Sequence, residues 1–196
     1  MPNKAAAGAL DDIRACIACN QGCIGHFHQG YSITCIQNPV SGRETKLAHP
    51  TLSLKPRRVL IAGGGPAGLK AAEVAAQSGH SVTLFEAGPR LGGQVNLAAM
   101  LPDRAEFGGL ITNLRNELSR LNVDIRLKTP LTRALIEDLA PDAVILATGS
   151  TAYRPEIEGA EEAHIVDAHQ VLLGQATPGD RVLVDDWRCD WIGIGI

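Results

Sequence analysis

An apolar strand, a glycine-rich turn and a helix-prone segment follow one another in mid-chain, and this succession constrains the fold most. Residues 58–62 are almost wholly apolar, as expected of a parallel strand that is buried on both faces. Residues 66–78 are rich in alanine and predict a helix. A strand, a G-x-G-x-x-G turn and a helix in this order are typical of dinucleotide-binding folds. The turn reads Gly63-Gly64-Gly65-Pro66-Ala67-Gly68.

The alternation of strands and helices continues beyond this unit. Residues 82–85, 125–127 and 143–147 are short apolar runs that predict further strands. From Phe107 to Leu121 the apolar residues keep a helical period. Strands that alternate with helices predict a doubly wound, Rossmann-like parallel α/β sheet that binds FAD or NAD(P).

Composition divides the chain into three zones. Residues 1–57 are rich in Cys, His, Gly, Asn and Pro and predict a loop-rich segment with a linker. Residues 58–155 form the predicted dinucleotide-binding domain. Residues 156–196 predict a link and the start of a second, incomplete dinucleotide-binding domain, with residues 181–185 as its first strand.

Glu86 lies at the end of the second predicted strand, 18 positions after Gly68. An acid at this place can accept a hydrogen bond from a ribose hydroxyl, and it favours a ribose without a 2′-phosphate. The glycines would let the backbone turn tightly and approach a pyrophosphate at the helix N-terminus. The alternative is a structural turn with a solvated carboxylate.

Four of the five cysteines fall within twenty residues, as Cys16-x2-Cys19-x3-Cys23-x11-Cys35. Thiolate sulfur is a soft ligand, which favours zinc or an iron–sulfur cluster. Structural zinc sites usually join two separated pairs of ligands, whereas a triplet with one later cysteine is closer to four-thiolate ligation of a [4Fe–4S] cluster. The spacing favours iron–sulfur and leaves zinc open.

Charge and hydropathy exclude several classes of partner. Eighteen Lys and Arg against 21 Asp and Glu create no basic field, so we expect no nucleic-acid binding. No apolar run approaches the roughly 20 residues of a membrane helix. Residues 1–14 show no secretory signal, so we expect a cytoplasmic protein, where disulfides are rare.

These motifs, with residues 92–94 (Gly-Gly-Gln) and 147–149 (Ala-Thr-Gly), occur in an order that resembles the old-yellow-enzyme-related iron–sulfur flavoproteins. That family includes 2,4-dienoyl-CoA reductase and trimethylamine dehydrogenase. The resemblance implies that Cys16, Cys19, Cys23 and Cys35 ligate one [4Fe–4S] cluster. It implies that FAD, or ADP in its place, is bound by Gly63, Gly65, Pro66, Ala67, Gly68, Glu86, Gly93, Gln94, Ala147, Thr148 and Gly149.

Family members also carry an FMN-bearing β/α barrel, which supplies the substrate chemistry. This chain begins almost at the cysteines, so we expect the barrel to be missing or on a separate chain, with FMN only there. We therefore expect no catalytic residue here and no activity of the fragment alone; the complete enzyme is a candidate homo-oligomer.

The resemblance implies the electron-transfer portion of an oxidoreductase. Residues 185–195 lack a second G-x-G-x-x-G turn, and Trp187 and Arg188 would block a pyrophosphate, which favours an amine dehydrogenase or N-demethylase. One alternative is a fragment of an NADPH-dependent 2,4-dienoyl-CoA or enoate reductase. Another is a zinc-stabilised nucleotide-binding module without catalysis.

Overall fold

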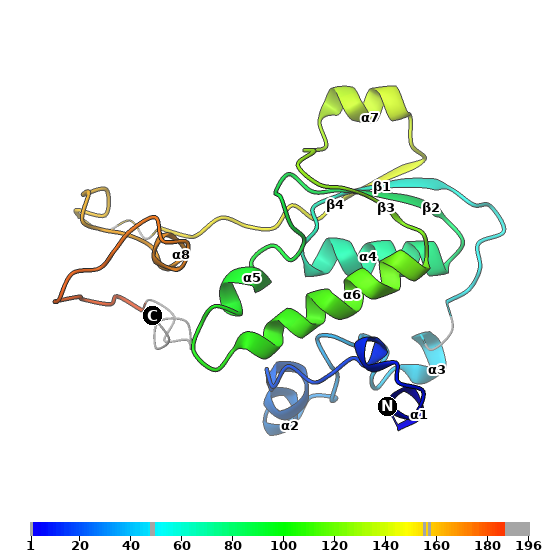
Figure 1. Ribbon diagram of the computed structural model, residues 1–196, viewed down its shortest axis with the longest axis horizontal. Helices are drawn as coiled ribbons and strands as arrows, with labels where there is room; N and C mark the ends of the chain where they lie inside the picture. Colours follow the sequence, from blue (N-terminus) through cyan, green and yellow to red (C-terminus); the bar gives the residue numbers. More distant parts are fainter. Residues whose placement is uncertain (1, 48–49, 155, 157, 187–196) are drawn as a thin grey trace.

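The computed structural model describes residues 2–47, 50–154, 156 and 158–186. Its centre is a four-stranded sheet in the order β3-β2-β1-β4 (Figure 1). All strand pairs are parallel, which confirms the predicted α/β class. The strands are β1 (Arg58–Ala62), β2 (Ser81–Phe85), β3 (Asp124–Arg126) and β4 (Ala143–Leu146).

Strand β1 lies between two partners, and its register brings their apolar residues together. Ile61 is opposite Leu84 of β2 on one side and Ile145 of β4 on the other. Ile61 and Leu84 are fully buried. The chain therefore runs outward from β1 through β2 to β3, then crosses back to place β4 on the other side of β1.

Two helices cover one face of the sheet. Helix α4 (Pro66–Gln77) packs on β1 and β2, and α6 (Gly108–Arg120) packs against α4. Gly65 precedes α4 as its N-cap, and Pro66 occupies the first turn, where its missing N–H costs no helical hydrogen bond. Helix α7 (Arg133–Leu139), which the sequence does not predict, lies on the opposite side of the sheet (Figure 1).

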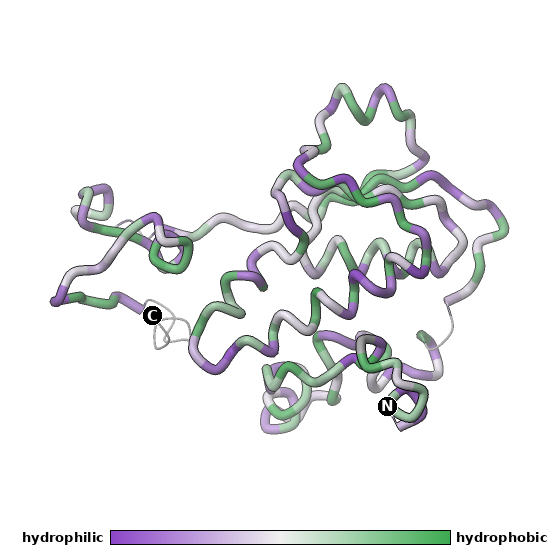
Figure 2. The backbone as a smooth tube through the Cα atoms, viewed as in Figure 1, coloured by the Kyte–Doolittle hydropathy of each residue, from purple (hydrophilic) through white to green (hydrophobic). Residues whose placement is uncertain are grey.

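The apolar faces of these helices and strands form one core. Figure 2 shows hydrophobic residues gathered along the strands. Helix α6 packs on this core. Its Leu114 and Leu118 are almost fully buried against Leu69 of α4 and the sheet. The helical period that the sequence displays from Phe107 onward is therefore the period of a core-facing helix.

The N-terminal segment is loop-rich, as predicted, and lies beside α4 and α6 (Figure 1). Its described residues form short helical pieces joined by irregular chain. They are α1 (Pro2–Ala6), a 3₁₀-helix (Leu10–Asp12), a π-turn (Gln21–Gly25), α2 (His26–His28) and α3 (Glu44–Leu47). Two further short helices, α5 (Val95–Ala98) and a 3₁₀-helix (Ala105–Phe107), precede α6.

The prediction of a strand at residues 181–185 is wrong. This run pairs with none of the described strands, and Leu183 is 94% exposed. A strand needs a hydrogen-bonded neighbour, and an apolar run does not supply one. The only helix of this zone within the described residues is α8 (Ala168–Leu172), which Asp167 caps. The interpretation of Trp187 and Arg188 concerns residues outside the described range.

No helix within the described ranges is both long and apolar enough to cross a membrane.

We expect Leu118→Ala to lower the free energy of unfolding by about 2–5 kcal/mol, because it leaves a cavity where α6 meets the core. Leu54 is 99% exposed, so Leu54→Ala is the matched control and should change stability by less than about 0.5 kcal/mol. Urea unfolding followed by circular dichroism measures both. Equal effects of the two substitutions would contradict this account of the core.

Candidate functional site

The glycine turn after β1 packs backbone directly on backbone. Gly63 has φ of +109°, and a Cβ there would lie 2.2 Å from the carbonyl oxygen of Ala147. A Cβ at Gly68 would lie 1.9 Å from the carbonyl oxygen of Gly63. Side chains at these positions cannot fit unless the backbone moves, so the first and third glycines are required by sterics.

The second glycine-rich segment lies against this turn. The N–H of Gly92 donates to the carbonyl of Gly64 at 2.8 Å. Gly93 has φ of +52°, and a Cβ on it would lie 3.2 Å from Cα of Gly65. Two segments that are almost thirty residues apart in sequence therefore expose adjacent, side-chain-free backbone, as a site for an extended dinucleotide needs.

Glu86 follows β2, and its carboxylate is oriented by the same loops. Oε2 accepts from the N–H of Gly64 at 2.7 Å, and Oε1 accepts from the N–H of Gly88 at 2.6 Å. A carboxylate offers about four lone-pair positions, so both oxygens keep capacity for ribose hydroxyls. The side chain is half-buried, which leaves it within reach of a ligand.

The end of β4 completes the arrangement. The N–H of Ala147 donates to the carbonyl of Ala62 at 2.8 Å, which fixes this strand end beside the turn. The side-chain amide of Gln94 donates to the backbone oxygen of Ser150 at 2.7 Å, so residues 94 and 147–150 lie together. Pro66 and Ala67 open α4 at the same edge, and Thr148 and Gly149 continue from Ala147.

This edge lies at the carboxyl ends of β1 and β4. Because the chain runs from β1 to β2 in one direction and places β4 in the other, β1 and β4 flank the point where the strand order reverses. Ligands of open α/β sheets bind in the crevice at such a point. The structure thus gathers the predicted dinucleotide residues where a dinucleotide is expected to bind.

The cysteine-bearing segment is held by backbone contacts. The N–H of Thr34 donates to the carbonyl of Gly22 at 2.8 Å, which brings the chain next to Cys35 beside the chain next to Cys23. Ala18 takes a left-handed conformation, and its N–H donates to Sγ of Cys16 at 3.3 Å. Hydrogen bonds of this kind to sulfur are one of the influences on iron–sulfur potentials.

All four cysteines of this segment are free thiols, one exposed and three partly buried. Their chemistry suits a soft metal. In the part of the chain that the structure describes, no three His, Cys, Asp or Glu side chains are grouped as metal ligands would be. Ligation of a cluster by Cys16, Cys19, Cys23 and Cys35 therefore stays a prediction.

A cavity of about 160 Å³ lies between part of the cysteine-bearing segment and the chain just before α6. Residues 18–21 line one side of it, and Arg104 and Phe107 line the other. The guanidinium of Arg104 lies over the Phe107 ring, 5.8 Å from its centroid. Sequence reasoning missed Arg104 because nothing in its local pattern indicates a neighbour more than eighty positions away.

The sequence pattern of one protein family matches residues 57–184. The description of this family is "Pyridine nucleotide-disulphide oxidoreductase". The match begins one residue before β1 and includes the whole sheet and α8, whereas the cysteine segment lies outside it.

Two curated relatives match nearly the full chain. The N,N-dimethylglycine/sarcosine dehydrogenase of Chromohalobacter salexigens is 41% identical over 194 residues, which are 94% of this chain and 28% of the relative. The NADH oxidase of Thermoanaerobacter brockii is 40% identical over 179 residues, 90% of this chain and 28% of the relative. The chain thus spans little more than a quarter of the length of these relatives.

A solved structure of 2-naphthoyl-CoA reductase in complex with 2-naphthoyl-CoA has the same fold. It superposes with a TM-score of 0.85 at 33% identity and covers 91% of this chain and 27% of its own. Because the match covers 91% of the chain, it extends beyond the sheet into the N-terminal segment.

We expect Gly68→Ala to lower the free energy of unfolding by about 1–3 kcal/mol, since the new methyl group overlaps the Gly63 carbonyl oxygen. Gly109 of α6 is the matched control, because a Cβ there meets nothing within 4 Å. Gly109→Ala should raise stability by up to about 1 kcal/mol through its better helix propensity. Denaturant unfolding checks both signs; a stabilising Gly68→Ala would refute the packing argument.

Proposed function

The chain belongs to the pyridine nucleotide-disulphide oxidoreductase family, and from this premise we propose that it is the electron-transfer portion of an iron–sulfur flavoprotein oxidoreductase. The observation that carries the proposal is the convergence of Gly65, Gly93 and Glu86 at the reversal of strand order. Three separate segments of the sequence contribute to that edge of the sheet. A turn with a purely structural role would need only the segment that contains it.

The ligand of this site would be the dinucleotide FAD, or the mononucleotide ADP in its place. Its pyrophosphate would lie at the first turn of α4, where Pro66, Ala67 and Gly68 follow the close-approach glycine. Glu86 would accept hydrogen bonds from the adenosine ribose. Gly93, Gln94, Ala147, Thr148 and Gly149 would border the extended remainder. When bound, FAD supplies one- and two-electron redox chemistry, and the protein positions it.

The four clustered cysteines would hold one [4Fe–4S] cluster. What supports this is the donor set: four free thiols between residues 16 and 35, with the two parts of the loop joined at Gly22 and Thr34. The cluster would supply single-electron transfer when bound. The protein contributes the thiolate ligands, the Ala18 N–H at a ligand sulfur and a loop that contacts the dinucleotide-binding domain.

The substrate class proposed is a secondary or tertiary amine, as for an amine dehydrogenase or N-demethylase. The similarity to N,N-dimethylglycine/sarcosine dehydrogenase supports this choice. The second candidate is a portion of an NADPH-dependent 2,4-dienoyl-CoA or enoate reductase, which the likeness to 2-naphthoyl-CoA reductase favours. In both cases, the substrate pocket and FMN would belong to a β/α barrel outside this chain, in a cytoplasmic and homo-oligomeric enzyme.

We expect Glu86→Ala to weaken ADP and FAD binding about ten- to one-hundred-fold, because hydrogen bonds to a charged group contribute about 1.5–3 kcal/mol. Isothermal titration of the purified chain with each ligand measures the loss. Glu137→Ala removes an exposed carboxylate that pairs only at the surface and should leave affinity unchanged. Glu86→Gln keeps one acceptor oxygen and should fall between. Equal affinities across this series would exclude Glu86 from the site.

Anaerobic reconstitution with iron and sulfide should give a brown chain with about four irons and four sulfides. Serine at Cys16, Cys19, Cys23 or Cys35 should each reduce iron content and bleach the visible absorption, whereas Cys189→Ser should not. A colourless chain that carries one zinc would instead support the non-catalytic zinc module.

A further inference from the structure

We propose that Arg14 is a positioning residue that closes the base of the cysteine-bearing loop, residues 16–35, and fixes it to the dinucleotide-binding domain. The inference deepens the proposed cluster site and rests on that function for its purpose. The contacts that support it join residues of this chain and involve no metal or cofactor.

Two side-chain contacts join the ends of the loop. Nη1 of Arg14 donates to Oδ1 of Asn38 at 3.4 Å, and Nε2 of Gln37 donates to the carbonyl of Ala15 at 2.8 Å. Arg14 and Ala15 directly precede Cys16, while Gln37 and Asn38 follow Cys35 by two and three positions. Gln37 is only 5% exposed, so its hydrogen bond is protected from water. These contacts hold the start and the end of the loop together.

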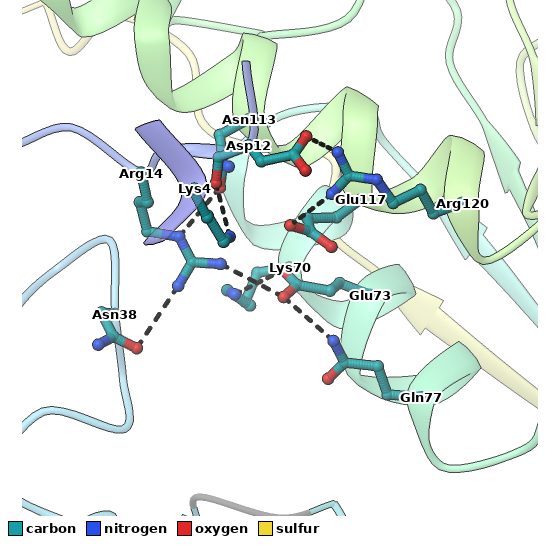
Figure 3. A network of polar contacts seen from close by, with 10 residues as sticks. All are labelled: Lys4, Asp12, Arg14, Asn38, Lys70, Glu73, Gln77, Asn113, Glu117 and Arg120. Atoms are coloured by element: carbon teal, nitrogen blue, oxygen red, sulfur yellow. Dashed lines mark hydrogen bonds and ion pairs between the residues drawn. The ribbon is translucent and has the colours of Figure 1, made fainter. Parts of the chain in front are cut away.

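The same guanidinium fixes the loop to two helices of the domain (Figure 3). Its Nε donates to Oδ1 of Asn113 in α6 at 2.9 Å, and Nη2 lies 3.4 Å from Oε1 of Glu73 in α4. Asn113 and Glu73 are 3% and 5% exposed. One planar cation thus reaches three partners in different directions, which a lysine ammonium on its single flexible stem cannot reproduce.

Glu73 does not depend on Arg14 alone. Its carboxylate also pairs with Lys70, at 2.5 Å, and accepts from Nε2 of Gln77 at 3.4 Å. These two partners lie on α4 itself and remain when Arg14 is removed. Loss of Arg14 should therefore release the loop more than it disturbs the helix beneath it.

Helix α4 connects the two sites mechanically. It begins at Pro66 in the glycine turn, and Glu73 lies seven residues later, about 10 Å along the helix axis. The cysteine loop and the dinucleotide turn are therefore attached to the same rigid helix. Arg14 sets the position of the first relative to the second.

The test is hydrogen exchange on the full-length, reduced, metal-free chain. Arg14→Gln should reduce protection of the amides in residues 16–35 at least tenfold, while amides of β1 and β2 keep wild-type protection. Arg14→Lys, which retains charge without the planar fork, should give an intermediate loss. Arg43→Gln is the matched control. It changes an exposed arginine of the N-terminal segment outside the loop and should leave the exchange of the loop amides unchanged.

Wild-type protection of the loop in Arg14→Gln, or an equal loss across loop and strands, would overturn the proposal. If Arg14→Gln does not fold, Asn38→Ala decides, since it removes the loop-end contact made by Arg14, keeps the one between Gln37 and Ala15, and leaves Arg14 with both helices. It should raise exchange in the loop alone, and unchanged exchange would overturn the closure. Iron uptake by the same variants is measured in a separate experiment. If the wild-type chain binds no iron, the proposed cluster is refuted, but the hydrogen-exchange result for Arg14 still stands.

Discussion

Between β1 and β4, the backbone at Gly63 lies so close to the Ala147 carbonyl oxygen that a Cβ would sit 2.2 Å from it. This close approach lets β1 turn sharply into α4 while the end of β4 stays hydrogen-bonded beside it. Gly68 allows the first turn of α4 to pack on the same strand end. The other parts of the candidate site, at Glu86 and Gly93, are arranged around this contact.

Elements whose burial leaves a pattern in consecutive residues could be predicted from the sequence. Strands β1 and β2 are continuous apolar runs, and α6 shows the period of a helix with one buried face. Gly63 and Gly68 could be selected because a side chain at either position would overlap backbone atoms. Helix α7 is short and contains no buried residue, so it carries no such pattern. The run at 181–185 resembles a strand locally, but strand formation depends on a neighbour.

Contacts between distant segments were beyond prediction. Arg14 and Asn113 are 99 positions apart, and neither lies in a recognisable motif. Their hydrogen bond exists because the loop-rich segment docks on α4 and α6, a tertiary event that local patterns do not encode. Spacing likewise selects four cysteines whose thiolates suit a soft metal, whereas bringing them together around one depends on the conformation of the loop. Residue type therefore indicates which chemistry a side chain can perform, but it does not indicate which side chains the fold brings together.

The two backbone N–H groups that hold the Glu86 carboxylate have a thermodynamic consequence. A glutamate that is free to rotate loses side-chain entropy when it orders around a ligand, which weakens binding. In this chain that entropy is lost during folding, so it would not be lost again if the proposed site binds a ribose. The restrained carboxylate would therefore place part of the conformational cost of the proposed binding on the free energy of folding.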